Sequence, residues 1–218
     1  MPELNTYIEH ALLKQNALKK ELRTLFEDAA KYNFWGVCIH PLYVADAKKY
    51  LSKTNVKIVT VIGFPLGANK TEVKVCEALE ALKDGADEFD MVLNVSALKD
   101  NNDAFVFEDI KAVRDAVKGK ILKVIVETDL LEPEEIKRAC LLAAKAKADF
   151  VKTSTGFVKN GVGATVQNVK LMYETVNPIG LKVKASGGIK DKKTALELIK
   201  AGAVRLGTSQ GVKIFKGE

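Results

Sequence analysis

The chain has 218 residues, 47% of them hydrophobic and 28% charged, which is typical of a globular protein with an ample core. Its net charge of +6 comes from 34 basic and 28 acidic residues that alternate along the chain. Without a basic block we expect no nucleic-acid binding. No apolar run approaches the ~18 residues of a membrane span, and the N-terminal segment lacks a signal-peptide layout. A cytoplasmic protein without membrane contact is therefore expected.

The metal-binding residue types are few and scattered. Cys38, Cys76 and Cys140 lie far apart, without a CxxC pair, and are expected to be reduced thiols. His10 and His40 show neither HxxxH nor HExxH spacing. We therefore expect no metal ion and no cofactor.

Short β-branched runs alternate along the chain with longer amphipathic segments. They predict strands over residues 6–11, 35–40, 57–63, 88–95, 121–128, 150–155, 181–186 and 204–209. Helical periodicity with start and stop signals predicts helices over residues 19–33, 68–86, 132–148 and 190–203. The third of these helices begins with Pro133 followed by two acids, a strong N-terminal signature.

This alternation predicts a parallel sheet in an α/β protein. Eight strand–helix units of about 27 residues each fit a single (β/α)8 TIM barrel covering residues 1–218, with no linker dividing the chain. The alternative is a doubly wound open sheet, which usually carries a glycine-rich turn after its first strand. No such turn is present, so the barrel is favoured.

Charged residues occur where the barrel lumen should be apolar. Side chains alternate along a barrel strand, and catalytic groups lie near the carboxyl ends of the strands. Alternation places Asp90, Lys123, Lys152 and Lys184 toward the lumen, whereas Lys182, near a strand start, is expected to reach water. A neutralising ion network without chemistry is one interpretation. Three lysines against so few acids favour the other, in which the surplus of cations lowers the pKa of one lysine.

A lysine with a lowered pKa is a nucleophile for carbonyl groups. It attacks a carbonyl only as the neutral amine, and both burial and a second ammonium nearby favour that form. Lys152 with Lys184 beside it would meet this requirement and form a Schiff base. Carbon–carbon bond cleavage next to the former carbonyl then needs proton transfer, for which Asp90, directly or through water, is the candidate.

Two glycine clusters follow the last two predicted strands. "SGGIKD" spans residues 186–191, and "LGTSQG" spans residues 206–211. Glycines let backbone N–H groups approach an anion, and the loops after strands 7 and 8 commonly bind phosphate in these barrels. A phosphorylated small molecule is the expected ligand.

Several motifs together resemble the deoxyribose-phosphate aldolase family. They are "TVIGFPLG", "ADEFDMVLNVSALK", "LKVIVET", "FVKTSTGF", "VKASGGIK" and "RLGTSQG", in order over residues 9–218. The resemblance implies a class I aldolase on a (β/α)8 barrel that reversibly cleaves 2-deoxy-D-ribose 5-phosphate into D-glyceraldehyde 3-phosphate and acetaldehyde. It also implies a role in deoxynucleoside breakdown, and assembly as a homodimer or higher homo-oligomer.

The resemblance assigns a role to individual residues. Lys152 would be the Schiff-base lysine, Lys184 the second lysine, Asp90 the proton donor and acceptor, and Lys123 a pocket residue. The phosphate would be held by Gly156, Gly187, Gly188, Gly207, Thr208 and Ser209, with Glu9 and Cys38 also in the pocket and Cys38 near its mouth.

Two departures from the family pattern concern the pocket. The usual Asp-His-Thr is Glu9-His10-Ala11 here, and the segment after the lysine motif, "STGFVKNGVGAT", is slightly longer than usual. Two other functions remain open at this point. One is a Schiff-base aldolase or transaldolase-like enzyme with a different donor, and the other is a non-catalytic barrel that binds sugar phosphates.

Overall fold

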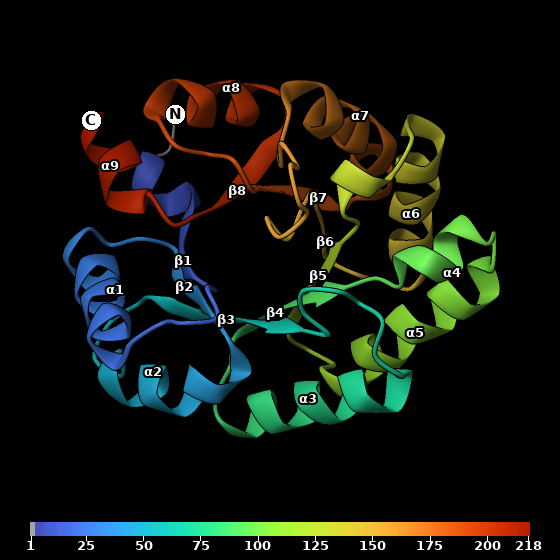
Figure 1. The fold of residues 1–218 in the computed structure, drawn as a ribbon. Helices are drawn as coiled ribbons and strands as arrows, with labels where there is room; N and C mark the ends of the chain where they lie inside the picture. Colours follow the sequence, from blue (N-terminus) through green and yellow to red (C-terminus); the bar gives the residue numbers. More distant parts are fainter. Residues whose placement is uncertain (1–2) are drawn as a thin grey trace.

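The computed structural model describes residues 3–218, in which eight parallel strands form a closed barrel surrounded by helices (Figure 1). Residues 1 and 2 of the expected domain lie outside the described part. The (β/α)8 prediction is confirmed, and every predicted strand is present. The strands are β1 (Ile8–Leu12), β2 (Gly36–Ile39), β3 (Lys57–Ile62), β4 (Glu88–Val92), β5 (Ile121–Ile125), β6 (Phe150–Lys152), β7 (Lys182–Ser186) and β8 (Ala203–Thr208).

The helices include more segments than the sequence patterns predicted. The four predicted helices correspond to α1 (Lys19–Lys31), α3 (Thr71–Lys83), α6 (Pro133–Lys145) and α8 (Lys192–Lys200). The others are α2 (Val44–Tyr50), α4 (Val95–Lys99), α5 (Asp103–Ala116), α7 (Val166–Val176) and α9 (Gly211–Lys216). Short 3-10 turns are η1 (Leu4–Tyr7), η2 (Pro41–Tyr43), η3 (Thr128–Leu130) and η4 (Asn177–Ile179).

Side chains of β4 divide between the helix layer and the lumen as alternation predicts. Phe89 and Met91 are completely buried in the large apolar core shared by strands and helices. Asp90, between them, points inward and meets lysines from other strands. The large apolar core therefore lies between the strands and the helices, whereas the interior of the barrel holds ionised groups beside a small apolar cluster of Cys38, Val59 and Val61.

A second buried ion pair lies behind β4 in the helix layer. The Lys74 Nζ of α3 contacts Asp109 Oδ2 of α5 at 2.6 Å, and both side chains are fully buried. Lys74 also donates to the carbonyl of Val92 at 3.1 Å, and the Thr71 hydroxyl donates to Asp109 Oδ1 at 2.8 Å. The pair therefore ties two helices to the carboxyl end of the strand that carries Asp90.

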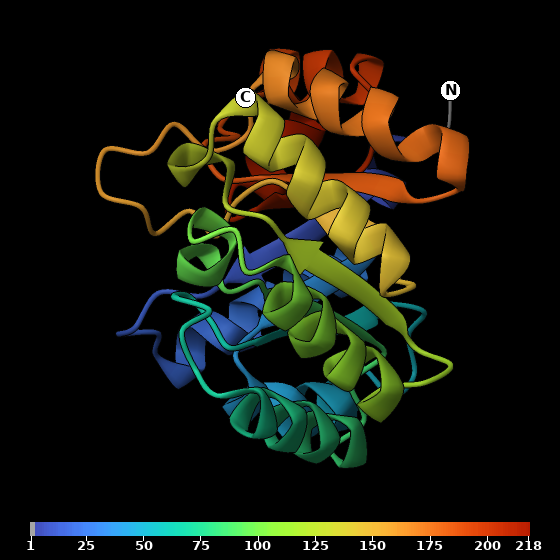
Figure 2. The same ribbon diagram turned by 90° about the vertical axis from the view of Figure 1, so that its right-hand side faces the viewer.

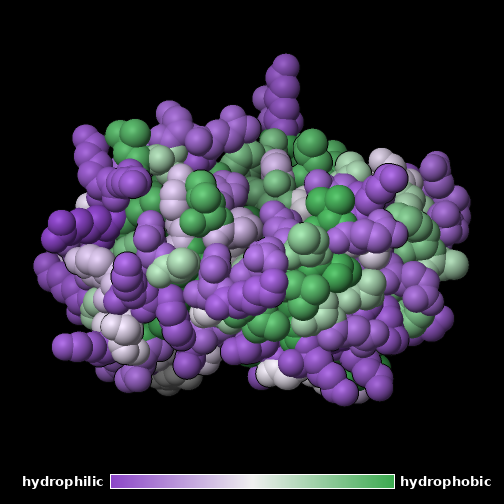
Figure 3. All heavy atoms as spheres, turned by 90° about the horizontal axis from the view of Figure 1, so that it is seen from below, coloured by the Kyte–Doolittle hydropathy of each residue, from purple (hydrophilic) through white to green (hydrophobic). Residues whose placement is uncertain are grey.

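Loops at the carboxyl ends of the strands form one rim of the barrel. Figure 2 shows the connection between β6 and α7 projecting from this rim. The surface in Figure 3 is mostly hydrophilic, with smaller groups of apolar side chains between the charged ones. Among residues 3–218, no helix is long and apolar enough to span a membrane.

Candidate active site

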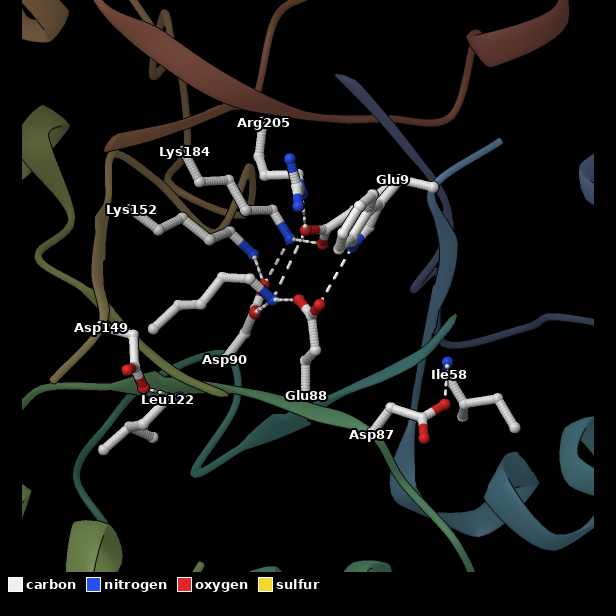
Figure 4. Close-up of polar contacts among 12 residues, drawn as sticks. Glu9, Ile58, Asp87, Glu88, Asp90, Leu122, Asp149, Lys152, Lys184 and Arg205 are labelled. Carbon is white, nitrogen blue, oxygen red and sulfur yellow. Dashed lines mark hydrogen bonds and ion pairs between the residues drawn. The ribbon is translucent and has the colours of Figure 1, made fainter. Parts of the chain in front are cut away.

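Asp90 is the centre of a cluster of buried amines (Figure 4). Its Oδ1 lies 2.9 Å from Lys123 Nζ, and its Oδ2 lies 2.8 Å from Lys152 Nζ and 2.6 Å from Lys184 Nζ. Burial alone would raise the pKa of Asp90, but the three ammonium groups outweigh it and hold this pKa well below its usual value. The four residues that alternation placed in the lumen are thus in direct contact.

Glu9 joins this cluster from β1, which closes the barrel against β8. Its carboxylate accepts a hydrogen bond from Lys184, and Glu9 Oε1 lies 3.4 Å from Lys123 Nζ. Burial disfavours the ammonium form of Lys184, but Asp90 and Glu9 outweigh that effect and raise its pKa above the ordinary value. The same opposition raises the pKa of Lys123. Both groups therefore stay ammonium ions at neutral pH.

Three residues of the network were not singled out from the sequence. Glu88 Oε2 lies 2.6 Å from Lys123 Nζ, and Glu88 Oε1 accepts a hydrogen bond of 3.0 Å from the Trp35 indole. Arg205 stacks on Trp35, with Cζ 3.4 Å from the ring centroid, and its Nε lies 3.9 Å from Glu9 Oε1. Glu88 lies two residues before Asp90 on β4, so strand alternation places both side chains toward the lumen. This alternation could have identified Glu88 from the sequence.

These added groups change the charge balance expected from the sequence. Two further carboxylates accompany Asp90, so the surplus of cations is smaller than three lysines around one acid would give. With every group ionised, the ion-paired network of the described chain has four cations and three carboxylates: Lys123, Lys152, Lys184 and Arg205 against Glu9, Glu88 and Asp90. Release of one proton makes the network neutral.

Cys38 lies deep in the lumen on β2 and is 1% exposed. Its Sγ and carboxylate oxygens of Glu9 and Asp90 all lie within 4.8 Å of one another. Both carboxylates are ion-paired to Lys184, so a cation bound there would have to displace an ammonium group. Burial raises the pKa of the Cys38 thiol, which favours the neutral form.

A cavity of about 610 Å³ opens at the rim formed by the loops after β1, β6, β7 and β8. Three of the lining residues are lysines that were not among the predicted site residues, namely Lys14, Lys190 and Lys213. All six residues expected to hold a phosphate line this cavity: Gly156, Gly187, Gly188, Gly207, Thr208 and Ser209. Backbone N–H groups and ammonium groups at one mouth are suited to an anion.

The long loop after β6 packs directly on the glycine turn after β7. Gly188 has a φ of +73°, and a Cβ there would lie 2.4 Å from the Val162 carbonyl oxygen. Ala164 N donates to the Gly187 carbonyl at 3.0 Å. Asp129 accepts hydrogen bonds of 2.9 Å from the backbone N–H groups of Val162 and Gly163. The loop after β6 therefore braces one wall of the cavity.

The floor of the cavity borders the ion network. Gly207 lines the cavity, and a Cβ at this position would lie 3.0 Å from Lys184 Cε and 2.7 Å from Ser186 Oγ. Thr155 is another lining residue, and both its hydroxyl and its backbone N–H donate hydrogen bonds to the carboxylate of Glu127. Burial raises the pKa of Glu127. A molecule bound at the rim thus lies next to the buried amines.

The Glu9-His10-Ala11 segment divides between three environments. Glu9 enters the ion network, and Ala11 lines the cavity. His10 points to the outside of the barrel, where it meets the Phe34 ring edge-on, and its Nδ1 lies 3.4 Å from the Thr208 carbonyl oxygen. Burial lowers the pKa of His10, so its imidazole is neutral and supports β8 rather than the reacting groups.

Comparison with known proteins points in the same direction as this geometry. The model of the DeoC/LacD family aldolase matches residues 7–217. The deoxyribose-phosphate aldolase of Streptococcus pneumoniae is 52% identical over 216 residues, which cover 99% of this chain and 97% of that protein. The enzyme of that name from Finegoldia magna is 50% identical, with 99% and 100% of the two chains covered.

A solved structure extends this similarity to the coordinates. The tetrameric deoxyribose phosphate aldolase from Aeropyrum pernix superposes with a TM-score of 0.91 at 33% identity, over 98% of this chain and 89% of that one. The sequence match and the barrel agree along almost the whole chain. The chain therefore belongs to the DeoC/LacD family of aldolases.

Proposed function

We propose that this chain is a class I aldolase that reversibly cleaves 2-deoxy-D-ribose 5-phosphate into D-glyceraldehyde 3-phosphate and acetaldehyde, as a lyase of deoxynucleoside breakdown. The observation that carries the proposal is the position of Lys152. Its side chain is 2% exposed, and its Nζ contacts Asp90 Oδ2 at 2.8 Å. The same oxygen contacts Lys184, whose side chain packs against Gly207 in the lining of a cavity suited to phosphate. Relatives named deoxyribose-phosphate aldolase support the choice of substrate.

The proposed reaction begins with imine formation at Lys152. Its neutral amine adds to C1 of the open-chain sugar, and loss of water gives an iminium ion. The C3 hydroxyl then loses its proton as the C2–C3 bond breaks, and the bonding electrons pass to the iminium. Glyceraldehyde 3-phosphate leaves, and the remaining enamine takes a proton at C2. Hydrolysis of the new iminium releases acetaldehyde and restores Lys152.

Asp90 and Lys184 are the proposed proton carriers for these steps. The carboxylate of Asp90 lies against both Lys152 and Lys184, at 2.8 and 2.6 Å, so a proton taken from the substrate has a short path between them. The raised pKa of Lys184 keeps an ammonium group beside the amine that must be neutral. Lys123 is the proposed counter-charge that keeps Asp90 ionised.

The phosphate is proposed to bind at the rim, with Gly156, Gly187, Gly188, Gly207, Thr208 and Ser209 around it. Positive φ angles at Gly187 and Gly188, +86° and +73°, turn the backbone sharply at this mouth. Glycine is the residue that adopts such angles without strain. Side-chain ammonium groups of Lys190 and Lys213 would add positive charge around the bound anion.

Reductive trapping tests the proposal. Acetaldehyde and borohydride should attach an ethyl group to Lys152, located by peptide mass spectrometry, and Lys152→Ala should abolish the adduct. Lys182→Ala is the matched control, since this lysine is exposed at the start of β7 and its loss should leave trapping intact. Trapping of another lysine, or equal trapping in Lys152→Ala, would refute the mechanism.

Product assays separate the two alternative functions. A Schiff-base aldolase or transaldolase-like enzyme with another donor would form the adduct but prefer dihydroxyacetone or a related donor over acetaldehyde. A non-catalytic sugar-phosphate-binding barrel would form no adduct with either donor. Retro-aldol release of acetaldehyde from 2-deoxyribose 5-phosphate is the result expected here.

We also propose that the chain assembles as a homodimer or higher homo-oligomer in the cytoplasm. The tetrameric state stated for the Aeropyrum pernix enzyme supports assembly. So do exposed apolar side chains such as Leu42 and Leu66, which are 79% and 77% exposed. The three cysteines are free thiols, in keeping with a reducing compartment. Sedimentation analysis would measure the oligomeric state.

A further inference from the structure

We propose that Arg205 and Glu88 are positioning residues that set, from the amino end of the barrel, how many of the buried amines carry a proton. The inference deepens the proposed function, because it concerns the ionisation of the amine that attacks the carbonyl. Neither residue lines the cavity, so both would act through the ion network rather than on the substrate.

Arg205 is held at the amino end by stacking. Its guanidinium lies over Trp35 at 3.4 Å, and its Nη1 donates to the Val204 carbonyl at 2.9 Å. The separation of 3.9 Å between Arg205 Nε and Glu9 Oε1 is too long for a hydrogen bond, so this contact is electrostatic. The guanidinium stays charged at any pH the protein meets, so it adds a fixed positive charge to the network.

Glu88 carries a negative charge and, like Arg205, is held in place by Trp35. The Trp35 indole donates to Glu88 Oε1 at 3.0 Å, while Glu88 Oε2 contacts Lys123 at 2.6 Å. Trp35 therefore contacts both remote charges, and Lys123 links Glu88 to Asp90. A change at Glu88 reaches Lys152 through three ion pairs, by way of Lys123 and Asp90. A change at Arg205 reaches it through four, by way of Glu9, Lys184 and Asp90.

The number of charges in the network predicts whether each variant makes proton loss from the buried amines easier or harder. The fully ionised network has four cations and three carboxylates, so one amine must be neutral for balance. Without Arg205 three cations face three carboxylates, and every amine can stay protonated. Without the Glu88 charge four cations face two carboxylates, and proton loss becomes easier. Removal of both restores the original excess of one cation.

The charged groups of the network around Lys152 come from most strands. The cationic ones are Lys184 on β7, Arg205 on β8 and Lys123 on β5. Glu9 on β1 and Asp90 and Glu88 on β4 are the anionic ones. The Cys38 thiol on β2 has a pKa raised by burial. Glu127, after β5, has its carboxylate engaged by Thr155. Of these, Arg205 and Glu88 can be neutralised without altering a group in contact with Lys152.

The experiment measures the ionisation of Lys152 without using the reaction. Protein carrying ¹³Cε-labelled lysine is titrated by NMR, and the resonance missing from Lys152→Met identifies Lys152. A unit charge about 10 Å away, at an effective dielectric constant of about 20, moves an amine's titration midpoint by about one pH unit. Arg205→Met should move the Lys152 midpoint up by about that amount, and Glu88→Gln should move it down.

Two variants serve as controls. Arg205→Lys keeps the charge and should titrate like the wild type, and the double variant Arg205→Met/Glu88→Gln should return close to the wild-type midpoint. The acid limb of the retro-aldol rate profile should follow the same order. If Arg205→Met does not fold, Arg205→Gln carries the same prediction.

Shifts of the same direction in both single variants, or no shift in either, would overturn the inference. A rate loss that is uniform over pH, with an unchanged titration, would also overturn it, since that is the effect of a purely structural role. Failure of the proposed function gives a different result. In that case the NMR midpoints still move in opposite directions, while Lys152 forms no borohydride adduct.

Discussion

The buried pair of Lys74 and Asp109 allows a quantitative prediction about stability. Asp109→Leu would leave the Lys74 ammonium without its counter-ion at 2.6 Å, in a site where both side chains are fully buried. Breaking such a pair from one side costs about 3–5 kcal/mol, whereas replacing both partners by apolar groups is often close to neutral. The single variant should therefore be much less stable than Lys74→Met/Asp109→Leu.

The expected size can be expressed as a melting temperature. For a chain of this length, a loss of 1 kcal/mol lowers the midpoint by about 2–4 °C, so Asp109→Leu should lower it by about 6–20 °C. Thermal and urea unfolding followed by circular dichroism measure the effect. Glu80→Ala, which removes half of an exposed pair with Lys83, is the matched control and should change the midpoint little. Equal losses in the single and double variants would refute the reasoning.

Three further predictions concern the reacting groups. Asp90→Asn should still be trapped by borohydride but lose about 10²- to 10⁴-fold in kcat, measured in single turnovers; loss of trapping would show that Asp90 has another role. Lys184→Leu removes a positive charge and so favours the protonated amine, which should move the acid limb of the rate profile up by about one pH unit; an unchanged profile contradicts this coupling. Gly188→Val should raise KM for the phosphorylated sugar about tenfold, with a smaller effect on free deoxyribose; equal effects on both would exclude a phosphate role for this turn.

The inward-facing ion cluster could be anticipated from strand periodicity. Asp90, Lys123, Lys152 and Lys184 were assigned to the lumen by alternation alone, and the structure brings them into contact. Lys182 reaches solvent as expected, because it lies at the start of its strand. These features depend on local backbone geometry, which a sequence pattern records directly.

Strand periodicity could not identify which charged residues pair with one another when the barrel closes. Glu9 and Lys184 are 175 residues apart and meet because β1 pairs with β8 at the closing seam. Arg205 is a single charged residue in the predicted strand over residues 204–209, and nothing nearby in the sequence indicates its partner. Its stacking on Trp35 depends on the tertiary fold. The segment that forms α7 contains several β-branched residues, and its weak helical propensity is the reason that no helix was predicted there. In the structure the Thr165 side chain caps this helix by accepting a hydrogen bond from the backbone N–H of Asn168.

Asp90 is the common counter-ion of three amines, and this sharing restricts how the sequence can change over evolution. Members of one network have non-additive effects, so the residue tolerated at one position depends on those at the others. Glu9, for example, contacts both Lys184 and Lys123. We expect substitutions in this lumen to be epistatic. Lineages would then exchange its acids and bases in coordinated sets, and grafting a single lumen residue between homologues should impair the recipient.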